Sequence, residues 1–346
     1  MITWRDTTVA PEVSIIKAIR ILDQVASQIL LITDSEDRLL GTLTDGDIRR
    51  AILAGYSLER PVIEIANSSP KTLSATSADE EILQVMRTYQ VHHIPLLDDN
   101  YKVVGVAGLN TPKNTNNVLS NTAVIMAGGK GSRLYPLTKN TPKPMLELAG
   151  RPILELIIEN LVKSGIRKIV ISVNYLADVI IDHFADGPNF GANISYVHET
   201  DPLGTAGSLG LLTEIPSHPI VVMNGDVLTQ VNFVNMLDHH NESGMAVTMA
   251  VHRIQNQVPY GVVEVTDGKV NQIKEKPVES YLVNSGIYVI NPDVLRSEHL
   301  KQKIDMPDLL AKLRKDGYDT GVFAVHEYWL DIGRPDELER ARKEHA

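Results

Sequence analysis

The chain has 346 residues, of which 43% are hydrophobic and 22% charged, and this is typical of a globular protein long enough for two domains. Residues 1–117 carry 11 basic and 15 acidic side chains and the remainder carry 22 and 28, so neither part has the basic character that bulk nucleic-acid binding requires. The absence of cysteine excludes disulfides, iron–sulfur clusters and thiolate zinc sites. The N-terminus lacks a signal-peptide pattern and no apolar run approaches ~18 residues, so we expect a cytoplasmic protein with no membrane partner.

Residues 8–112 contain a weak internal repeat with a period of 64 residues. Ile32–Leu43 aligns with Leu96–Ala107, and Ala18–Val25 aligns with Ile82–Tyr89. Each half reads as a helix, a strand, a turn with acidic residues and a second strand, a unit too small to bury its own core. We therefore expect the halves, about 8–60 and 68–112, to pack together. The first half contains GTLTDGDIRRAI, and the pair resembles a tandem cystathionine-β-synthase-type (CBS) domain of α+β structure.

The CBS resemblance implies a regulatory site for an adenine nucleotide. In such pairs a Thr contacts phosphate and an Asp contacts the ribose hydroxyls, and Thr44 and Asp47 match this pattern. The second repeat has Gly108 and Thr111 at these positions, so one of two potential sites lacks its carboxylate. The resemblance also implies a homodimer or higher homo-oligomer. The residues alone allow another interpretation, in which Thr44 and Asp47 cap the helix that contains residues 48–53 and the module only dimerises.

A polar stretch, NTPKNTNN at residues 110–117, predicts a boundary between two domains. We expect the CBS pair at 1–112, a linker at 113–120 and a second domain at 121–346. In the second domain short strands alternate with helical segments, which predicts an α/β fold with a mostly parallel sheet and helices on both faces. The segments expected are one helix at Ile153–Val162 and strands at Ala123–Met126, Lys168–Val173, Ile194–His198 and Ile220–Met223.

The first of these strands runs into a glycine-rich turn within AVIMAGGKGSRLYPLTKNTPKP, residues 123–144. Glycines let backbone N–H groups close around phosphate oxygens, and Arg133 and Lys143 supply positive charge. The spacing differs from the dinucleotide-binding fingerprint and from the Walker P-loop. The segment resembles the signature of the sugar-1-phosphate nucleotidyltransferases, which implies a Rossmann-like, GT-A-like domain with Arg133 and Lys143 as catalytic residues. The nucleotide-binding residues implied here are Ala127, Gly128, Gly129, Gly131 and Ser132.

Two acidic residues are candidates for binding Mg²⁺, a hard cation that prefers one or two carboxylates together with phosphate oxygens. Asp226 directly follows the strand Ile220–Met223 and an Asn-Gly turn, and it matches the family's catalytic, metal-binding Asp. Asp331 lies in WLDIG, which resembles the family's W-x-D-x-G setting for the second metal ligand. Without the resemblance, Asp226 could cap the next helix and Asp331 could be a turn residue before a helix that starts at Pro335.

The resemblance also assigns a sugar pocket and a nucleobase loop. Lys276 in Glu275-Lys276-Pro277 is expected to neutralise the sugar phosphate as a catalytic cation, and Glu275 to accept hydrogen bonds from sugar hydroxyls. Gly261 and Asn284 match further positions that line the sugar pocket.

In the loop at residues 198–207, Glu199, Gly204 and Thr205 are expected to bind the nucleotide. Glu199 could accept both adjacent donors of guanine, which favours GTP. It could instead take one bond from a pyrimidine, contact ribose or stabilise the loop.

These features together imply Mg²⁺-dependent transfer of a nucleotidyl group from GTP to a sugar 1-phosphate, with release of diphosphate. A CBS pair before such a domain resembles glucosamine-1-phosphate guanylyltransferases of legionaminic acid synthesis, and more broadly the mannose- and heptose-1-phosphate guanylyltransferases. Glucosamine 1-phosphate is therefore the expected sugar, for a bacterial surface glycan. Two alternatives stay open: a uridylyl- or thymidylyltransferase, and a regulatory protein that senses nucleotides or NDP-sugars without catalysis.

Overall fold

The structure, a computed structural model, describes residues 4–25, 29–89, 91, 93–108 and 118–345. It divides into two compact units, Met1–Asn114 and Thr115–Ala346. We expected a linker at 113–120. Residues 113–117 of it lie outside the described residues, and Leu119 and Ser120 belong to a strand. In the described part of the chain, no helix combines the length and the apolar character needed to span a membrane.

The N-terminal unit contains the repeated helix, strand and strand that the sequence predicted, and each helix is preceded by a short strand that was not predicted. In each half the first strand is parallel to the second and the second is antiparallel to the third, in the orders β1-β2-β3 and β4-β5-β6. The elements are β1 (Thr8–Val9), α1 (Ile15–Gln24), β2 (Ile29–Thr33), β3 (Leu39–Thr44), α2 (Asp45–Leu53), β4 (Leu73–Ser74), α3 (Asp79–Tyr89), β5 (Ile94–Leu97) and β6 (Val103–Ala107).

The repeat extends to irregular details of the backbone. A register shift after Ile32 in β2 is repeated after Leu96 in β5. Asp34 accepts hydrogen bonds from backbone N–H groups two and four residues later, and Asp98 repeats both bonds. The halves share one buried cluster, made of Ile29, Leu31, Leu97 and Val103. Each half therefore completes the core of the other, as the small size of the repeat required.

The C-terminal unit is built on a seven-stranded sheet with the order β11-β10-β7-β12-β17-β14-β18. β17 is antiparallel to both of its neighbours and every other pairing in the sheet is parallel, which confirms the mostly parallel α/β fold. The sheet strands are β7 (Leu119–Met126), β10 (Ile166–Val173), β11 (Asn193–His198), β12 (Ile220–Asn224), β14 (Val247–Gln257), β17 (Val278–Ile290) and β18 (Thr320–Val325). The four strands expected from sequence are therefore present, with small extensions.

Helices cover both faces of this sheet. Successive residues of β7 alternate between two buried clusters, with Ala123 and Ile125 in one and Val124 in the other. Side chains of α4, α5, α7 and α9 join the first cluster, and α8 with several short helices joins the second. The helices are α4 (Ile153–Lys163), α5 (Ala177–Phe184), α6 (Gly204–Gly207), α7 (Phe233–Ser243), α8 (Met306–Lys315) and α9 (Pro335–Glu344). The smaller strands are β8 (Glu147–Leu148), β9 (Arg151–Pro152), β13 (Val227–Thr229) and β19 (Trp329–Asp331).

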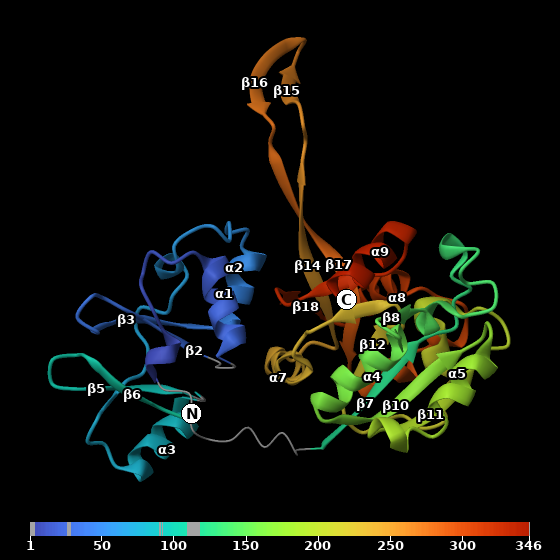
Figure 1. Cartoon of the computed structure of the whole chain (residues 1–346), viewed down its shortest axis with the longest axis horizontal. Helices are drawn as coiled ribbons and strands as arrows, with labels where there is room; N and C mark the ends of the chain where they lie inside the picture. Colours follow the sequence, from blue (N-terminus) through green and yellow to red (C-terminus); the bar gives the residue numbers. More distant parts are fainter. Residues whose placement is uncertain (1–3, 26–28, 90, 92, 109–117, 346) are drawn as a thin grey trace. The chain divides into compact units, whose positions relative to one another are not determined.

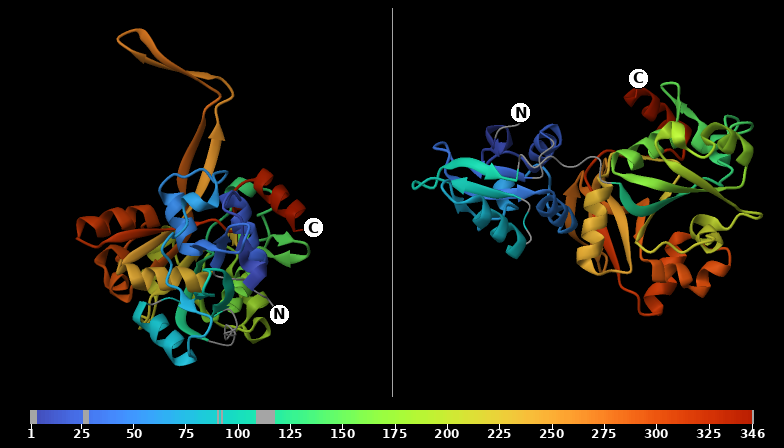
Figure 2. Two further views of the ribbon diagram at one scale, coloured as in Figure 1. Left: turned by 90° about the vertical axis from the view of Figure 1, so that its left-hand side faces the viewer. Right: turned by 90° about the horizontal axis from the view of Figure 1, so that it is seen from below.

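Strands β14 and β17 continue beyond the sheet as a long two-stranded ribbon, which we call the arm (residues 252–283). The arm ends in a hairpin of β15 (Gly261–Thr266) and β16 (Lys269–Glu275). The views in Figure 1 and Figure 2 agree that this hairpin stands clear of the sheet and helices of its own unit. Its valines and isoleucines at 263, 265, 270 and 273 are 47–61% exposed. The sequence did not predict this projection.

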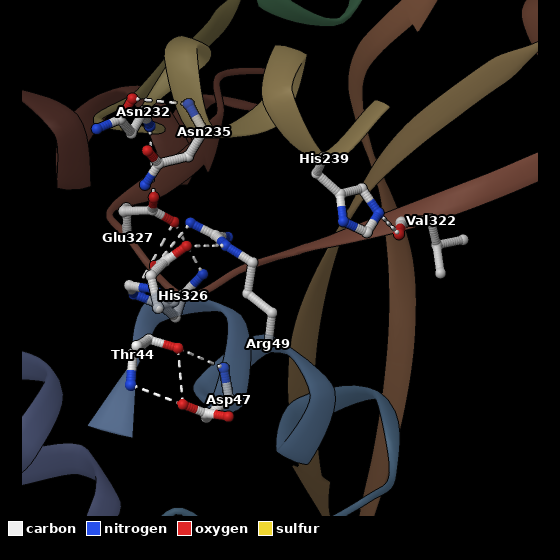
Figure 3. Close-up of polar contacts among 10 residues, drawn as sticks. Thr44, Asp47, Arg49, Asn232, Asn235, His239, Val322, His326 and Glu327 are labelled. Atoms are coloured by element: carbon white, nitrogen blue, oxygen red, sulfur yellow. Dashed lines mark hydrogen bonds and ion pairs between the residues drawn. The ribbon is translucent and has the colours of Figure 1, made fainter. Parts of the chain in front are cut away.

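Polar side chains attach α7 to its surroundings (Figure 3). Asn232 caps the first turn by accepting a hydrogen bond from the backbone N–H of Asn235 at 3.1 Å, and the ring of His239 contacts the carbonyl oxygen of Val322 in β18 at 3.2 Å. These contacts satisfy groups at a helix start and on an edge strand that burial would otherwise leave unpaired.

His240 on the same helix is 1% exposed. Its Nδ1 lies 2.8 Å from Thr248 Oγ1 and its Nε2 lies 2.9 Å from Asn291 Oδ1. Burial lowers the pKa of His240, an effect that the bond to Asn291 partly opposes. The neutral ring can donate to Asn291 and accept from Thr248, so both nitrogens are satisfied without a charge.

We expect acid to destabilise the C-terminal unit through His240. The unfolded chain binds a proton near the ordinary histidine pKa of ~6.5, whereas the native ring stays neutral to lower pH. Stability from this residue is therefore complete above the unfolded pKa and is lost as pH falls through the native pKa. Urea unfolding of the protein and of His240→Gln, from about pH 7.5 to about pH 5.5, should show a flatter pH dependence for the variant. The exposed His218→Gln is the matched control, and equal acid sensitivity in all three proteins would contradict the prediction.

Candidate active site

The glycine-rich loop after β7 lines a cavity of about 210 Å³. Ala127 donates its backbone N–H to the carbonyl oxygen of Ser172, which fixes the start of the loop beside β10. Gly131 has a φ of +61°, and a Cβ there would lie 2.9 Å from Thr138 Cγ2, so this position requires glycine. The predicted residues that line the cavity are Ala127, Gly129, Gly131, Ser132, Arg133, Lys143 and Asp226.

Lys143 and Asp226 form an ion pair at this cavity, although 82 residues separate them in the chain. Lys143 is only 8% exposed, because the short helical turn that carries it is buried. Asp226 precedes β13, whose first residue, Val227, pairs with Asp331 on β19. Ile332 also donates its N–H to the Asp226 carbonyl oxygen at 3.0 Å. The antiparallel pairing of β13 and β19 thus brings together the two predicted metal ligands.

The two carboxylates have the properties of a cation site. Asp226 Oδ1 and Asp331 Oδ1 are both buried and have no hydrogen-bond partner among the described residues. Burial raises the pKa of Asp331, and the nearby charge of Asp226 raises it further, while Lys143 acts in the opposite direction. Unpaired oxygens on neighbouring carboxylates cost free energy unless a cation binds them. The chemistry of these two oxygens fits a hard cation such as Mg²⁺.

Arg133 lies beside the turn that follows Asp331. A Cβ on Gly333 would lie 3.3 Å from Arg133 Nη1, so the guanidinium packs closely against this glycine. Both residues line the same cavity. The glycine of WLDIG is therefore the surface against which the Arg133 guanidinium packs.

A second cavity, of about 350 Å³, adjoins the other carboxylate. Asp331 lines it, as does Asn284, whose Nδ2 donates to the Tyr288 hydroxyl at 2.5 Å. The side-chain carbonyl of Asn284 accepts the N–H of Gly286 at 2.9 Å, so this side chain is fixed. The lining residues that sequence reasoning did not assign include Tyr288, Asp305 and Trp329. Asp305 lies outside the motifs, and an Asp before a helix reads as an ordinary cap.

The nucleobase loop corrects one expectation. Glu199 follows β11, and Ser172 donates to its Oε1 at 2.6 Å while the N–H of Leu203 donates to its Oε2 at 2.9 Å. Each oxygen therefore already accepts one bond that stabilises the loop, and guanine would have to share these oxygens. Thr205 is also engaged, because its Oγ1 accepts the N–H of Met306 at 2.8 Å. The alternative in which Glu199 stabilises the loop describes this structure, so the position of Glu199 no longer favours GTP.

The arm carries three of the four predicted sugar-binding residues. Gly261, Glu275 and Lys276 lie at the base of the β15–β16 hairpin, where Gly261 pairs with Glu275. They line neither of the two cavities, whereas the fourth, Asn284, lines the second. The structure therefore brings together Arg133, Lys143, Asp226 and Asp331 but leaves Lys276 and Glu275 apart from them.

Thr44 and Asp47 are engaged within the N-terminal unit (Figure 3). They form a capping box at the start of α2, in which the Asp47 carboxylate accepts the N–H of Thr44 at 2.8 Å and its hydroxyl at 2.7 Å. The other oxygen of Asp47 accepts from Arg50 at 2.6 Å. The structure thus shows Thr44 and Asp47 as caps of α2, which is the alternative that the residues alone allowed. Thr111 in the second repeat lies outside the described residues, and Gly108 has a φ of +96°.

Comparison with known sequences gives two matches. Residues 122–346 match the Nucleotidyl transferase family, and residues 2–54 and 62–109 match the CBS domain. The mannose-1-phosphate guanylyltransferase catalytic subunit beta of Danio rerio is 34% identical over 224 residues, which cover 62% of each chain. The mannose-1-phosphate guanyltransferase of Yarrowia lipolytica is 33% identical over 227 residues, covering 62% of this chain and 61% of the relative. The match thus spans about three fifths of these relatives.

Solved structures show the same fold. A putative glucose-1-phosphate thymidylyltransferase from Bacillus anthracis, in complex with a sucrose, has a TM-score of 0.53 at 23% identity and covers 65% of this chain and 94% of its own. HddC from Yersinia pseudotuberculosis has a TM-score of 0.51 at 26% identity, covering 65% and 100%, and HddC complexed with GMP-PN has a TM-score of 0.51 at 25% identity with the same coverage. The match to the Nucleotidyl transferase family covers more than half of the chain, and the chain therefore belongs to this family.

Proposed function

We propose that the protein is a Mg²⁺-dependent sugar-1-phosphate guanylyltransferase, which converts a sugar 1-phosphate and GTP to a GDP-sugar and diphosphate. The observation that carries this proposal is the ion pair between buried Lys143 and half-buried Asp226, beside Asp331, at a cavity lined by the glycine-rich loop. A triphosphate needs backbone donors, cations and a metal site together, and this cavity offers all three.

The reaction is an in-line attack by a phosphate oxygen of the sugar 1-phosphate on the α-phosphorus of GTP. The attacking oxygen is already an anion, so no residue needs to remove a proton. The task of the protein is to hold two anions together and to neutralise charge on the α-phosphate and the departing diphosphate. Lys143 and Arg133 are placed for this at the first cavity, while the second cavity, on the Asp331 side, is our proposed sugar pocket. Bound Mg²⁺ supplies Lewis acidity to the phosphate oxygens.

GTP is favoured over UTP and dTTP by the relatives. The curated proteins with 33–34% identity are named mannose-1-phosphate guanylyltransferases, and one structural neighbour, at 25% identity, holds GMP-PN. The thymidylyltransferase neighbour, at 23% identity, is evidence of fold alone. Glucosamine 1-phosphate remains our proposed sugar, on the basis of the CBS pair placed before this domain.

Regulation by an adenine nucleotide at the CBS pair also remains a proposal. Asp47 has both carboxylate oxygens engaged within α2 and its cap, so a ribose would have to replace bonds that Thr44 and Arg50 now make. A homodimer through the CBS pair is proposed from the resemblance. Neither proposal is needed for the chemistry at the catalytic unit.

The proposed activity is tested by diphosphate release with Mg²⁺, crossing GTP, UTP, dTTP, CTP and ATP with the 1-phosphates of glucosamine, N-acetylglucosamine, mannose and glucose. Turnover should be selective for GTP. Asp226→Asn and Lys143→Met should each lower kcat by about 10²–10³-fold, the usual cost of removing one preorganised group at developing charge. Asp267→Asn, in the exposed turn of the arm hairpin, is the matched control. Binding of nucleotide without turnover for any pair would favour the sensor alternative.

The metal site makes a separate prediction about stability. Asp331 is more readily protonated in the fold than in the unfolded chain, so its charge destabilises the metal-free protein at neutral pH. Asp331→Asn should therefore melt at a higher temperature than the unmodified protein in EDTA. Mg²⁺ should raise the melting temperature of the unmodified protein but not that of the variant. Differential scanning calorimetry measures both, and a variant that melts lower in EDTA and still responds to Mg²⁺ would refute this account.

A further inference from the structure

The second cavity is lined in part by an exposed acidic side chain with no assigned role, Asp305. It precedes α8 and lines the cavity together with Asp331, and no Lys or Arg is among the described residues of this lining. Ser285 lines the same cavity, is 1% exposed, and has an Oγ without a hydrogen-bond partner among the described residues. A buried hydroxyl that lacks a partner is costly, so it indicates that a polar ligand completes this pocket.

The Asp305 carboxylate is held from one side. Its Oδ1 accepts the N–H of Thr205 at 2.9 Å and lies 3.4 Å from the Thr205 hydroxyl. Gly204 permits this approach, since a Cβ there would lie 2.7 Å from Asp305 Oδ1. Asp305 Oδ2 makes no hydrogen bond with the residues that the structure describes. One oxygen is thus fixed by the protein and the other is available to a ligand, which is the arrangement of a preorganised binding group.

Helix capping does not account for Asp305. Aspartate at this position normally accepts N–H groups of the first helical turn, but Asp305 makes no such side-chain bond to α8. The N–H of Met306 is satisfied by the Thr205 hydroxyl at 2.8 Å instead. The helix start is therefore stabilised by a residue of another element, and the Asp305 carboxylate is left for a different task.

The charge of the pocket indicates what that task is. Asp305 and Asp331 both contribute negative charge to the lining. A metal ion bound between Asp226 and Asp331 would neutralise the charge of Asp331. The negative charge of Asp305 would then remain without a compensating cation in this lining. A protonated amino group on the ligand supplies the missing charge, and a charge-assisted hydrogen bond is about twice as strong as a neutral one.

We propose that Asp305 is a specificity-determining residue, and that it selects a sugar 1-phosphate bearing a protonated amino group over the same sugar with a hydroxyl or an acetylated amine. Thr205 is the positioning residue that aims its carboxylate. The inference rests on the proposed function, because it needs the second cavity to be the sugar pocket of a nucleotidyltransferase. It adds the side chain that recognises the amino group of that sugar.

The test is kcat/KM at fixed GTP and Mg²⁺ for the 1-phosphates of glucosamine, glucose and N-acetylglucosamine, with the full-length protein. Asp305→Asn keeps an oxygen for Thr205 and removes the charge. It should lower kcat/KM for glucosamine 1-phosphate about 10- to 100-fold, mainly through KM, and change that for glucose 1-phosphate less than about threefold. Asp308→Asn, on the exposed first turn of α8 and outside the cavity lining, should match the unmodified protein.

Thermal melting of Asp305→Asn separates a folding defect from a change in recognition, because a merely structural role would lower kcat/KM for all three sugars alike. An equal loss with every sugar, or an unmodified enzyme that turns over glucose 1-phosphate at least as well as glucosamine 1-phosphate, would overturn the inference and leave the proposed function intact. No turnover with any sugar and GTP would instead overturn the proposed function and this inference with it.

Discussion

Two half-buried carboxylates placed side by side, each with one buried oxygen, are the constraint on which the catalytic unit depends. Asp226 comes from the middle of the domain sequence and Asp331 from near its C-terminal end, and the pairing of β13 with β19 holds them together despite their like charges. Lys143 compensates one of them from a buried turn after the glycine-rich loop. Because Lys143 offsets the repulsion between the two carboxylates, the loop, the end of β12 and the C-terminal segment must be in place together. The remaining negative charge of the two carboxylates can be neutralised by a cation, which we propose to be Mg²⁺.

The pair also divides the space around it. The cavity with Asp226 has the glycine loop and two basic side chains, whereas the cavity with Asp331 has hydroxyls, two amides and a further carboxylate. Our proposal assigns a nucleoside triphosphate to the first lining and a sugar to the second. Their phosphates would then meet at the metal site between them, which is what an in-line transfer requires. The hydrogen bonds of Thr205 with Asp305 and Met306 fix the wall of the second cavity.

Most of the sheet was predictable because its parallel strands are buried on both faces and read as apolar runs. Ile220–Asn224 and Ile166–Val173 are of this kind, and the apolar spacing from Ile153 located α4 to within one residue. The period of 64 residues likewise identified the two halves of the N-terminal unit, down to the matching turns at Asp34 and Asp98.

Other parts were not predictable from local sequence. Val263 and Ile273 alternate with polar residues as any half-buried strand would, so nothing local indicated an arm. Glu199 looked free to read a base because its partners, Ser172 and the backbone of Leu203, are chosen by tertiary structure. The contacts of Asp305 could not be predicted for the same reason, since the residue that it binds, Thr205, is 100 positions away in the sequence.

The most direct test of the central claim is the position of a metal ion in crystals grown with Mn²⁺ and a non-hydrolysable GTP analogue. Anomalous diffraction should give a peak bound by Asp226 Oδ1 and Asp331 Oδ1, with the triphosphate under the glycine-rich loop. Lys143 should then have left Asp226 for a phosphate oxygen. A nucleotide bound elsewhere, or a metal peak away from both carboxylates, would contradict the account.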